Sequence, residues 1–157
     1  MVTELMKAEE ILNEYKDDVN KLAEFLPWLT EKNGKNVASL YSQDELTTHS
    51  VSFPVYDATL MRFINVASET KLMDRNYRYV YTRNRIRTTK DELDYIEKAT
   101  IQQMGQLGGI LSNYVMGGRT RARMWSEGMD KGIFLAVVDK CKELIDFWTN
   151  ATVVKGD

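Results

Sequence analysis

Residues 133–148 read IFLAVVDKCKELIDFW, and this stretch decides the fold class. Its apolar residues recur at spacings of three and four, so they fall on one stripe of an α-helix. The stripe consists of Ile133, Val137, Cys141, Leu144, Ile145 and Trp148. The pattern predicts a C-terminal helix with a buried apolar face, in which Cys141, the only cysteine of the chain, is a buried thiol rather than a reactive one.

The N-terminal part of the chain shows the same helical spacing. The apolar stripe consists of Leu5, Ala8, Leu12, Tyr15, Val19, Leu22, Leu26 and Leu29. Pro27 has no backbone N–H and restricts the residue before it, so we expect a kink or break near residues 24–26. Asn33-Gly34 is a suitable end for this element.

Two more helices are predicted between these ends. Asp57 is placed to cap a helix over residues 58–71. Thr89 and Glu92 have capping-box spacing at the start of a long helix that runs to Tyr114. Three glycines inside this helix each cost it about 1 kcal/mol relative to alanine, which indicates close approach of another backbone or an interruption. These glycines are Gly105, Gly108 and Gly109.

Two segments have the period-two pattern of β-strands. Apolar and polar residues alternate over residues 46–55, and tyrosines alternate in residues 74–83, DRNYRYVYTR. We therefore predict a mainly α (α+β) fold, a single helical domain over residues 1–157 with a small two-stranded β element. At 43% apolar and 28% charged, the composition is that of an ordinary soluble domain.

Motifs for common catalytic and metal-binding sites are missing from the sequence. His49 is the only histidine, so neither a zinc site of the usual Cys/His spacing nor a serine triad has support. The acidic residues at the predicted start of the long helix are explained by the helix dipole. We expect no metal and no cofactor, and we favour a protein without enzymatic activity. The longest apolar run, residues 133–138, is far shorter than the ~20 residues of a membrane span, so a cytoplasmic protein is expected.

Arginine is concentrated in one part of the chain. Eight of the nine arginines lie between Arg75 and Arg123. Residues 74–123 carry ten basic and five acidic side chains, whereas residues 1–73 carry seven basic and twelve acidic ones. A guanidinium group binds phosphate or carboxylate in two places and stacks on aromatic rings, which lysine does poorly. The basic segment is therefore the predicted binding site for nucleic acid, a nucleoprotein complex or another anionic partner.

The tyrosines of this segment suggest how such a partner would be held. On the predicted strand three rings lie on one face, where bases could stack, while the arginines meet phosphates. The candidate residues are Arg75, Arg78, Arg83, Arg85, Arg87, Arg119, Arg121, Arg123, Tyr77, Tyr79 and Tyr81. The last three arginines fall in a short basic helix expected over residues 119–127. In the structural alternative, the rings pack against a helix and the arginines pair with acidic helices.

Residues 114–138 read YVMGGRTRARMWSEGMDKGIFLAVV, in which a basic aromatic stretch leads to Glu127-Gly128 and then to Gly132-Ile133 at the start of a helix. Together with Leu26-Pro-Trp-Leu29 and Phe53-Pro-Val-Tyr56, this resembles a family of small bacterial proteins known only as a domain of unknown function. The resemblance lies mainly in residues 110–148. It implies a bacterial setting, often a phage or mobile element, and assigns no activity.

Three hypotheses for function follow. The first is a non-enzymatic accessory protein that binds an anionic or nucleoprotein partner through the basic segment. The second is a protein-interaction module or inhibitor that uses Trp28, Trp125 and Trp148, which an exposed aromatic patch would favour. The third is an enzyme whose dispersed carboxylates and arginines meet in the fold. A concave pocket with converging groups of perturbed pKa would favour that third hypothesis. No pattern in the sequence identifies the partner or the oligomeric state.

Overall fold

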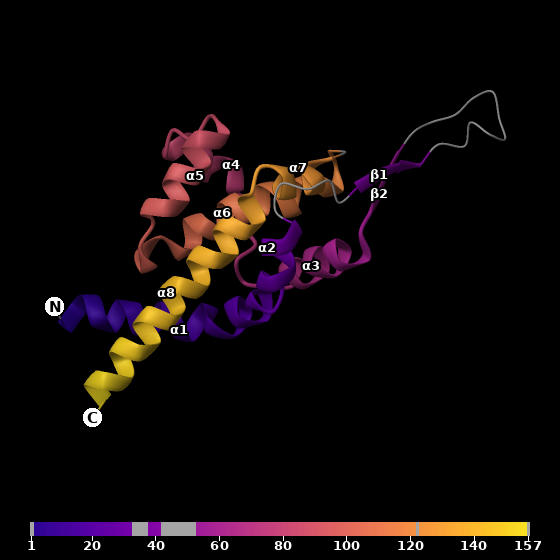
Figure 1. Cartoon of the computed structure of the whole chain (residues 1–157). Coiled ribbons are helices and arrows are strands. Elements are labelled where there is room, and N and C mark those ends of the chain that lie inside the picture. Colours follow the sequence, from indigo (N-terminus) through magenta and orange to yellow (C-terminus); the bar gives the residue numbers. More distant parts are fainter. Residues whose placement is uncertain (1, 33–37, 42–52, 122, 157) are drawn as a thin grey trace, which may run out of the picture.

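The computed structural model describes residues 2–32, 38–41, 53–121 and 123–156, with the side chains of residues 7–32, 57–121 and 123–151. The described residues are mainly helical (Figure 1). In chain order the elements are α1 (Val2–Ala23), α2 (Leu26–Lys32), β1 (Ala38–Tyr41), β2 (Phe53–Tyr56), α3 (Ala58–Ser68), α4 (Tyr77–Arg83), α5 (Thr89–Lys98), the 3₁₀-helix η1 (Ile101–Gln103), α6 (Met104–Val115), the 3₁₀-helix η2 (Gly117–Arg119), α7 (Met124–Asp130) and α8 (Ile133–Gly156).

The C-terminal helix α8 is the element around which the others pack. It contacts α1, α2, α5, α6 and α7, and it crosses α1 in Figure 1. Ile133, Val137, Cys141 and Ile145 are buried along its stripe, whereas Leu144 and Trp148 are half-buried. Burial raises the pKa of the Cys141 thiol to about 12. The predicted C-terminal helix and its buried cysteine are confirmed.

The N-terminal helix and its break are also confirmed. The helix α1 ends at Ala23 and α2 begins at Leu26, immediately before Pro27. The apolar stripe continues across the break, since Leu22 and Leu29 are both buried. A proline removes one helical hydrogen bond and crowds the preceding turn, which explains why the chain restarts as a new helix there.

The strands β1 and β2 pair antiparallel, with Ala38 opposite Tyr56 and Tyr41 opposite Phe53. The strand predicted over residues 46–55 lies mostly outside the described residues, as does His49, and only its last three residues fall in β2. The strand predicted over residues 74–83 is wrong, because residues 77–83 form the helix α4. The two-stranded element that these two segments were expected to form is therefore not seen.

The contact of α4 with α6 explains why this segment is helical despite its alternating tyrosines. Asp74 Oδ1 accepts a hydrogen bond from the backbone N–H of Asn76 at 2.8 Å, in the turn that leads into α4. Val80 then packs directly on Gly109, where a Cβ atom would lie 2.7 Å from Val80 Cγ2. Preference for strand geometry is weak and yields to tertiary packing of this kind.

The long helix predicted from Thr89 to Tyr114 is interrupted. The helix α5 ends at Lys98, and Thr100 begins the new turn η1 by a capping box with Gln103, whose Oε1 accepts from Thr100 N at 2.8 Å. The first capping box is also shifted by one residue, because Thr88 and Asp91 form it instead of Thr89 and Glu92. Residues one position apart on a helix point about 100° apart. Glu92 is consequently free to point inward.

Other boundaries differ from the prediction in smaller ways. Asp57 caps α3 as expected, accepting from Thr59 N at 2.7 Å, but α3 ends at Ser68 rather than at residue 71. Residues 119–127 are not a single basic helix. They include the end of η2, a turn, and the start of α7, which Arg123 precedes with a left-handed φ of 74°.

The glycines of α6 give a direct test of the packing. A Cβ atom at Gly108 would overlap the carbonyl group of Leu72, which is backbone and cannot rotate away, whereas no atom lies within 4 Å of the corresponding position at Gly105. We expect Gly108→Ala to lower the free energy of unfolding and Gly105→Ala to raise it by up to about 1 kcal/mol, the difference in helix propensity. Urea denaturation monitored by circular dichroism measures both changes. Equal effects of the two substitutions would contradict the packing described for α6.

Candidate functional site

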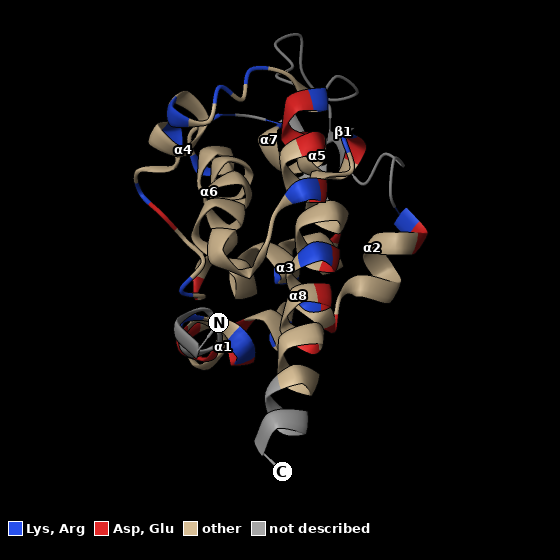
Figure 2. Cartoon of the chain, turned by 90° about the vertical axis from the view of Figure 1, so that its left-hand side faces the viewer, with Lys and Arg blue, Asp and Glu red and all other residues tan. Residues whose placement is uncertain are grey.

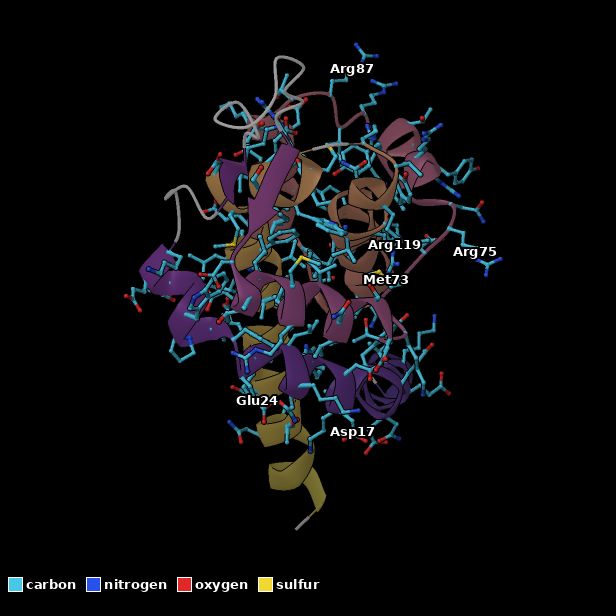
Figure 3. All side chains as sticks on the ribbon, turned by 90° about the vertical axis from the view of Figure 1, so that its right-hand side faces the viewer. Asp17, Glu24, Met73, Arg75, Arg87 and Arg119 are labelled. Atoms are coloured by element: carbon cyan, nitrogen blue, oxygen red, sulfur yellow. The ribbon has the colours of Figure 1, made fainter. Side chains whose placement is uncertain are left out.

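The arginines around α4 form an exposed group, here called the arginine surface. Its members are Arg75, Arg78, Arg83, Arg85 and Arg87. Arg78 and Arg83 lie on α4, and the others lie in the segments before and after it. Figure 2 shows α4 and the loop that follows it at the opposite end of the molecule from α1. In Figure 3, Arg87 projects at the top of the view and Arg75 at its right-hand edge, whereas Asp17 and Glu24 lie in the lower part.

The guanidinium groups of the arginine surface have no carboxylate partner among the described side chains. The salt bridges between described side chains are formed by lysines: Lys90–Asp94, Lys131–Glu127, Lys140–Glu143 and Lys142–Asp146. The sequence supports the same conclusion, because residues 75–87 include five arginines and no acidic residue. The described structure therefore shows no pairing of these arginines with acidic helices.

The other three candidate arginines, Arg119, Arg121 and Arg123, are exposed but lie in different surroundings. Arg119 donates a hydrogen bond to Ser68 Oγ at 2.8 Å, and Arg121 donates to Asn113 Oδ1 at 3.2 Å. Arg123 precedes α7. These side chains do not extend the arginine surface as one row.

The three tyrosines do not share one face. In a helix, residues two positions apart point in nearly opposite directions, whereas residues four apart point the same way. Tyr79 accordingly points outward and is 62% exposed. Tyr77 and Tyr81 are half-buried. The predicted three-ring platform is wrong, and Tyr79 is the exposed ring of this helix.

Tyr79 lies beside a groove between α4 and the start of α6. The groove has a volume of about 430 Å³ and is lined by Asp74, Tyr79, Val80, Arg83, Asn84, Gly105 and Gln106. The guanidinium carbon of Arg83 lies 5.8 Å from the centroid of the Tyr79 ring. Gly105 leaves the wall of the groove open. An aromatic ring, a guanidinium group and side-chain amides thus meet at one concave surface.

A second cavity, here called the Glu92 cleft, lies between α4, α5, α6 and α7. It has a volume of about 360 Å³ and is lined by Tyr81, Arg87, Thr88, Thr89, Glu92, Asn113, Tyr114, Arg121, Met124, Glu127 and Lys131. Tyr114 connects it to the hydrophobic core, because its ring packs edge-on against Phe134 of α8 at a centroid distance of 6.2 Å. The cleft therefore stands directly above the core.

Hydrogen bonds around the Glu92 carboxylate form the floor of this cleft. Glu92 is 4% exposed. Tyr81 Oη donates to Glu92 Oε2 at 2.6 Å, and Tyr114 Oη lies 2.9 and 2.8 Å from Oε1 and Oε2. Asn113 Nδ2 donates to Tyr81 Oη at 3.2 Å, and Asn113 Oδ1 accepts from Arg121. The network leads from an exposed guanidinium group to a buried carboxylate.

Burial and the neighbouring carboxylate keep the two phenols protonated. The pKa of Tyr81 is raised, first by burial and then by its hydrogen bond to Glu92. The pKa of Tyr114 is raised by burial and by the negative charge of Glu92, which outweigh the opposing effect of Arg121. Both phenols, which are protonated at neutral pH even at the ordinary pKa of tyrosine, thus remain hydrogen-bond donors in alkaline solution as well. No Lys or Arg of the described residues lies within salt-bridge distance of Glu92.

Three cationic side chains stand at the rim of the Glu92 cleft. Arg87 precedes α5, Arg121 precedes α7 and Lys131 follows it. The Lys131 ammonium lies 5.7 Å from the centroid of the Tyr114 ring and 3.8 Å from Glu127 Oε2. Cations from separate parts of the chain therefore converge over one cavity.

The sequence reasoning missed Glu92 as a site residue, although it left a signal. Glu92 lies one turn before Ile96, so it falls on the apolar stripe of α5, where a charged residue is out of place. The expected capping box of Thr89 and Glu92 accounted for the charge of Glu92, so its place on the apolar stripe did not stand out; the structure forms the capping box with Thr88 and Asp91 instead. A charged residue at a position that helical spacing predicts to be buried is the signal that could have identified it.

The remaining candidates have structural explanations in the described residues. Asp91 caps α5, and the backbone N–H groups of Arg87 and Thr88 lower the pKa of its carboxyl group. No group of three or more His, Cys, Asp or Glu side chains in the described part of the chain could hold a metal ion. The three tryptophans are half-buried against the core, so they do not form an exposed patch.

Comparison with known proteins identifies the family. A family of unknown function (DUF6508) matches residues 15–147, so the chain belongs to this family. The match covers much more of the chain than residues 110–148, in which the resemblance mainly lies. No curated protein and no solved structure matches the chain. The described helices include none that is long and apolar enough to span a membrane.

The Tyr114–Glu92 contact predicts a dependence of stability on pH. Tyr114→Phe should lower the free energy of unfolding at pH 7 by about 1–3 kcal/mol, because it removes a buried hydrogen bond to a carboxylate. The raised pKa of Tyr114 means that above about pH 10 only the unfolded state releases this proton. The contribution of Tyr114 to the free energy of unfolding is thus complete below about pH 10 and decreases above it. Above about pH 10, the difference in the free energy of unfolding between wild type and Tyr114→Phe should therefore narrow by about 1.4 kcal/mol per pH unit.

Urea titrations between pH 7 and pH 11 would measure this gap. Tyr79→Phe is the matched control, because Tyr79 is exposed and its hydroxyl group has no hydrogen-bond partner among the described residues. It should change the free energy of unfolding at pH 7 by less than about 0.5 kcal/mol. A gap for Tyr114→Phe that stays constant up to pH 11 would contradict the assignment.

Proposed function

We propose that the protein is a non-enzymatic accessory protein that binds an anionic partner, single-stranded nucleic acid in particular, through the arginine surface. The observation that carries the proposal is the exposure of five arginines around α4, none of which is paired with a described carboxylate. Guanidinium groups that lack an internal partner are available to phosphates, which they bind in a bidentate manner.

The distribution of charge supports a polyanion rather than a small acidic ligand at this surface. Residues 75–87 carry five positive charges over a turn, a short helix and a loop, with no acidic side chain among them. Such a surface attracts successive phosphates along a strand and releases their counterions. An extended partner can contact Arg78 and Arg83 of α4 together with the arginines on either side.

The groove beside Tyr79 supports a single-stranded rather than a double-helical partner. A base stacks on an aromatic ring only when it is unpaired or turned out, and stacking tolerates any base. Tyr79 offers one such ring, with the Arg83 guanidinium beside it. One ring in place of three lowers the expected contribution of stacking, so the arginines supply most of the affinity.

The setting expected from the sequence belongs to the same proposal. A cytoplasmic protein of a bacterium, phage or mobile element has access to single-stranded nucleic acid and to nucleoprotein complexes. Family membership assigns no activity. The protein-interaction hypothesis would use the half-buried tryptophans together with Phe147, which is exposed beside Trp148. The enzyme hypothesis retains one observation, the converging groups of the Glu92 cleft.

Salt dependence tests the role of the arginine surface. Fluorescence anisotropy with a labelled single-stranded oligonucleotide should show affinity that falls steeply with salt, with a log–log slope of about −0.7 for each neutralised phosphate. Arg78→Ala/Arg83→Ala should make the slope less negative by about 1.4, because two phosphate contacts are lost. The control is Arg62→Ala/Lys16→Ala, which removes two exposed cations from α3 and α1 and should leave the slope unchanged. Failure to bind at low salt would refute the proposal.

Stacking is tested separately at Tyr79. Tyr79→Ala should weaken binding by about 1–3 kcal/mol without changing the salt slope, because the ring carries no charge. Tyr77→Phe is the matched control, since it retains the ring of a half-buried tyrosine. A loss of affinity equal in the two variants would show that no base stacks on Tyr79.

A further inference from the structure

We propose that the Glu92 cleft is a second binding site, for a small phosphate monoester that carries free hydroxyl groups, such as a sugar phosphate. The ligand differs from that of the arginine surface, with which the cleft shares Arg87 alone, and the inference does not depend on nucleic-acid binding. It rests on the shape of the cleft, on the cations at its rim and on the uncompensated carboxylate at its floor.

The size of the cleft limits the ligand. Sites for small molecules in proteins are concave and have volumes of about 300–1,000 Å³. The Glu92 cleft, at about 360 Å³, is at the lower end of this range. It has room for a phosphorylated sugar but not for a dinucleotide or a folded chain. The ligand is therefore a small molecule or the end of a longer one.

The rim supplies the groups that bind a phosphate. Arg87 has no hydrogen-bond or ion-pair partner for its side chain among the described residues, and Arg121 directs one nitrogen to the neutral amide of Asn113. Lys131 is 3.8 Å from Glu127, the one carboxylate at the rim. Two guanidinium groups retain donors for the oxygens of a dianionic phosphate, and charge-assisted hydrogen bonds of this kind are roughly twice as strong as those between neutral groups.

The floor supplies the groups that bind hydroxyls. Glu92 and Asn113 both line the cleft, and the carboxylate oxygens of Glu92 have lone pairs beyond those used by the two phenols. A hydroxyl group of the ligand can donate to Glu92 while the phosphate remains at the rim. An inorganic phosphate would make the first set of contacts and lack the second.

The Glu92 carboxylate connects α4, α5 and α6 by accepting hydrogen bonds from Tyr81 and Tyr114, yet no described cation lies within salt-bridge distance of it. A buried carboxylate without an adjacent cation is costly, so its position in a cavity indicates a role in addition to this connection. The cationic side chains that line the cleft lie at its rim and not beside Glu92. Residues that keep such a cost while facing a cavity are typical of binding sites.

Isothermal titration calorimetry on the full chain at low ionic strength tests the proposal, with ribose 5-phosphate, ribose and inorganic phosphate as probes. Ribose 5-phosphate should bind at least tenfold more tightly than inorganic phosphate, and ribose should give no detectable heat. Arg87→Ala/Arg121→Ala should weaken the binding of ribose 5-phosphate at least tenfold. The matched control, Arg78→Ala/Arg83→Ala, removes two arginines that do not line the cleft and should leave this affinity unchanged.

The role of the floor is tested by Glu92→Gln. This variant should bind ribose 5-phosphate no more tightly than inorganic phosphate, because a hydroxyl group loses its strongest acceptor. If circular dichroism shows that Glu92→Gln does not fold, Asn113→Ala, at a half-buried position, replaces it, with at least a threefold loss expected. Equal affinity of the wild type for ribose 5-phosphate and inorganic phosphate, or unchanged affinity in Arg87→Ala/Arg121→Ala, would overturn the proposal.

The source of the phosphate monoester is distinguished by competition. An oligonucleotide with a 5′-phosphate and the same oligonucleotide with a 5′-hydroxyl are each titrated against bound ribose 5-phosphate. Displacement by neither at concentrations where ribose 5-phosphate saturates the cleft supports a free sugar phosphate. Displacement by the phosphorylated end alone supports the same site chemistry with a nucleic-acid terminus as its source. Equal displacement of ribose 5-phosphate by the two oligonucleotides would show that the cleft does not recognise a phosphate monoester, and the proposal would fail.

Discussion

The close approach of residues 72–80 to the helix α6 is the constraint on which the rest of the structure depends. Gly108 and Gly109 bring the backbone near Leu72 and the side chain of Val80 directly onto α6. One turn later Ser112 accepts a hydrogen bond from Asp74 N at 2.9 Å, which holds the entry to α4. This contact fixes the direction of α4. As a result, Tyr81 on one side of α4 reaches Glu92, and the arginines of α4 are exposed to solvent.

Periodicity in the sequence was sufficient where an element is long enough to repeat it. The stripes of α1 and α8 extend over several turns, so the spacing of their apolar residues identifies them without knowledge of their neighbours. The helix α4 has only seven residues. Over so short a segment, alternating tyrosines resemble a strand, and only the contact with Gly109 decides the outcome. Long-range contacts of this kind have no local signature.

The candidate site shows the same difference between what the local sequence indicates and what long-range contacts decide. Composition located the arginines but left their exposure open, because a run of five arginines without an acidic residue can still pair with acidic helices elsewhere in the chain. Glu92 was missed because its environment is built from Tyr81 and Tyr114, which lie 11 and 22 residues away. A buried carboxylate is recognised by what surrounds it, and the surroundings belong to the tertiary structure.

The bond between Tyr81 and Glu92 joins the two candidate sites mechanically. Tyr81 belongs to the helix that carries Arg78 and Arg83, whereas Glu92 forms the floor of the cleft. A ligand that shifts the carboxylate would tilt α4, and a partner that pulls on α4 would strain the carboxylate. Any such coupling free energy is reciprocal by thermodynamic necessity. The short helix α4 would then couple the two sites, so that a ligand in the Glu92 cleft changes the affinity of the arginine surface for its partner.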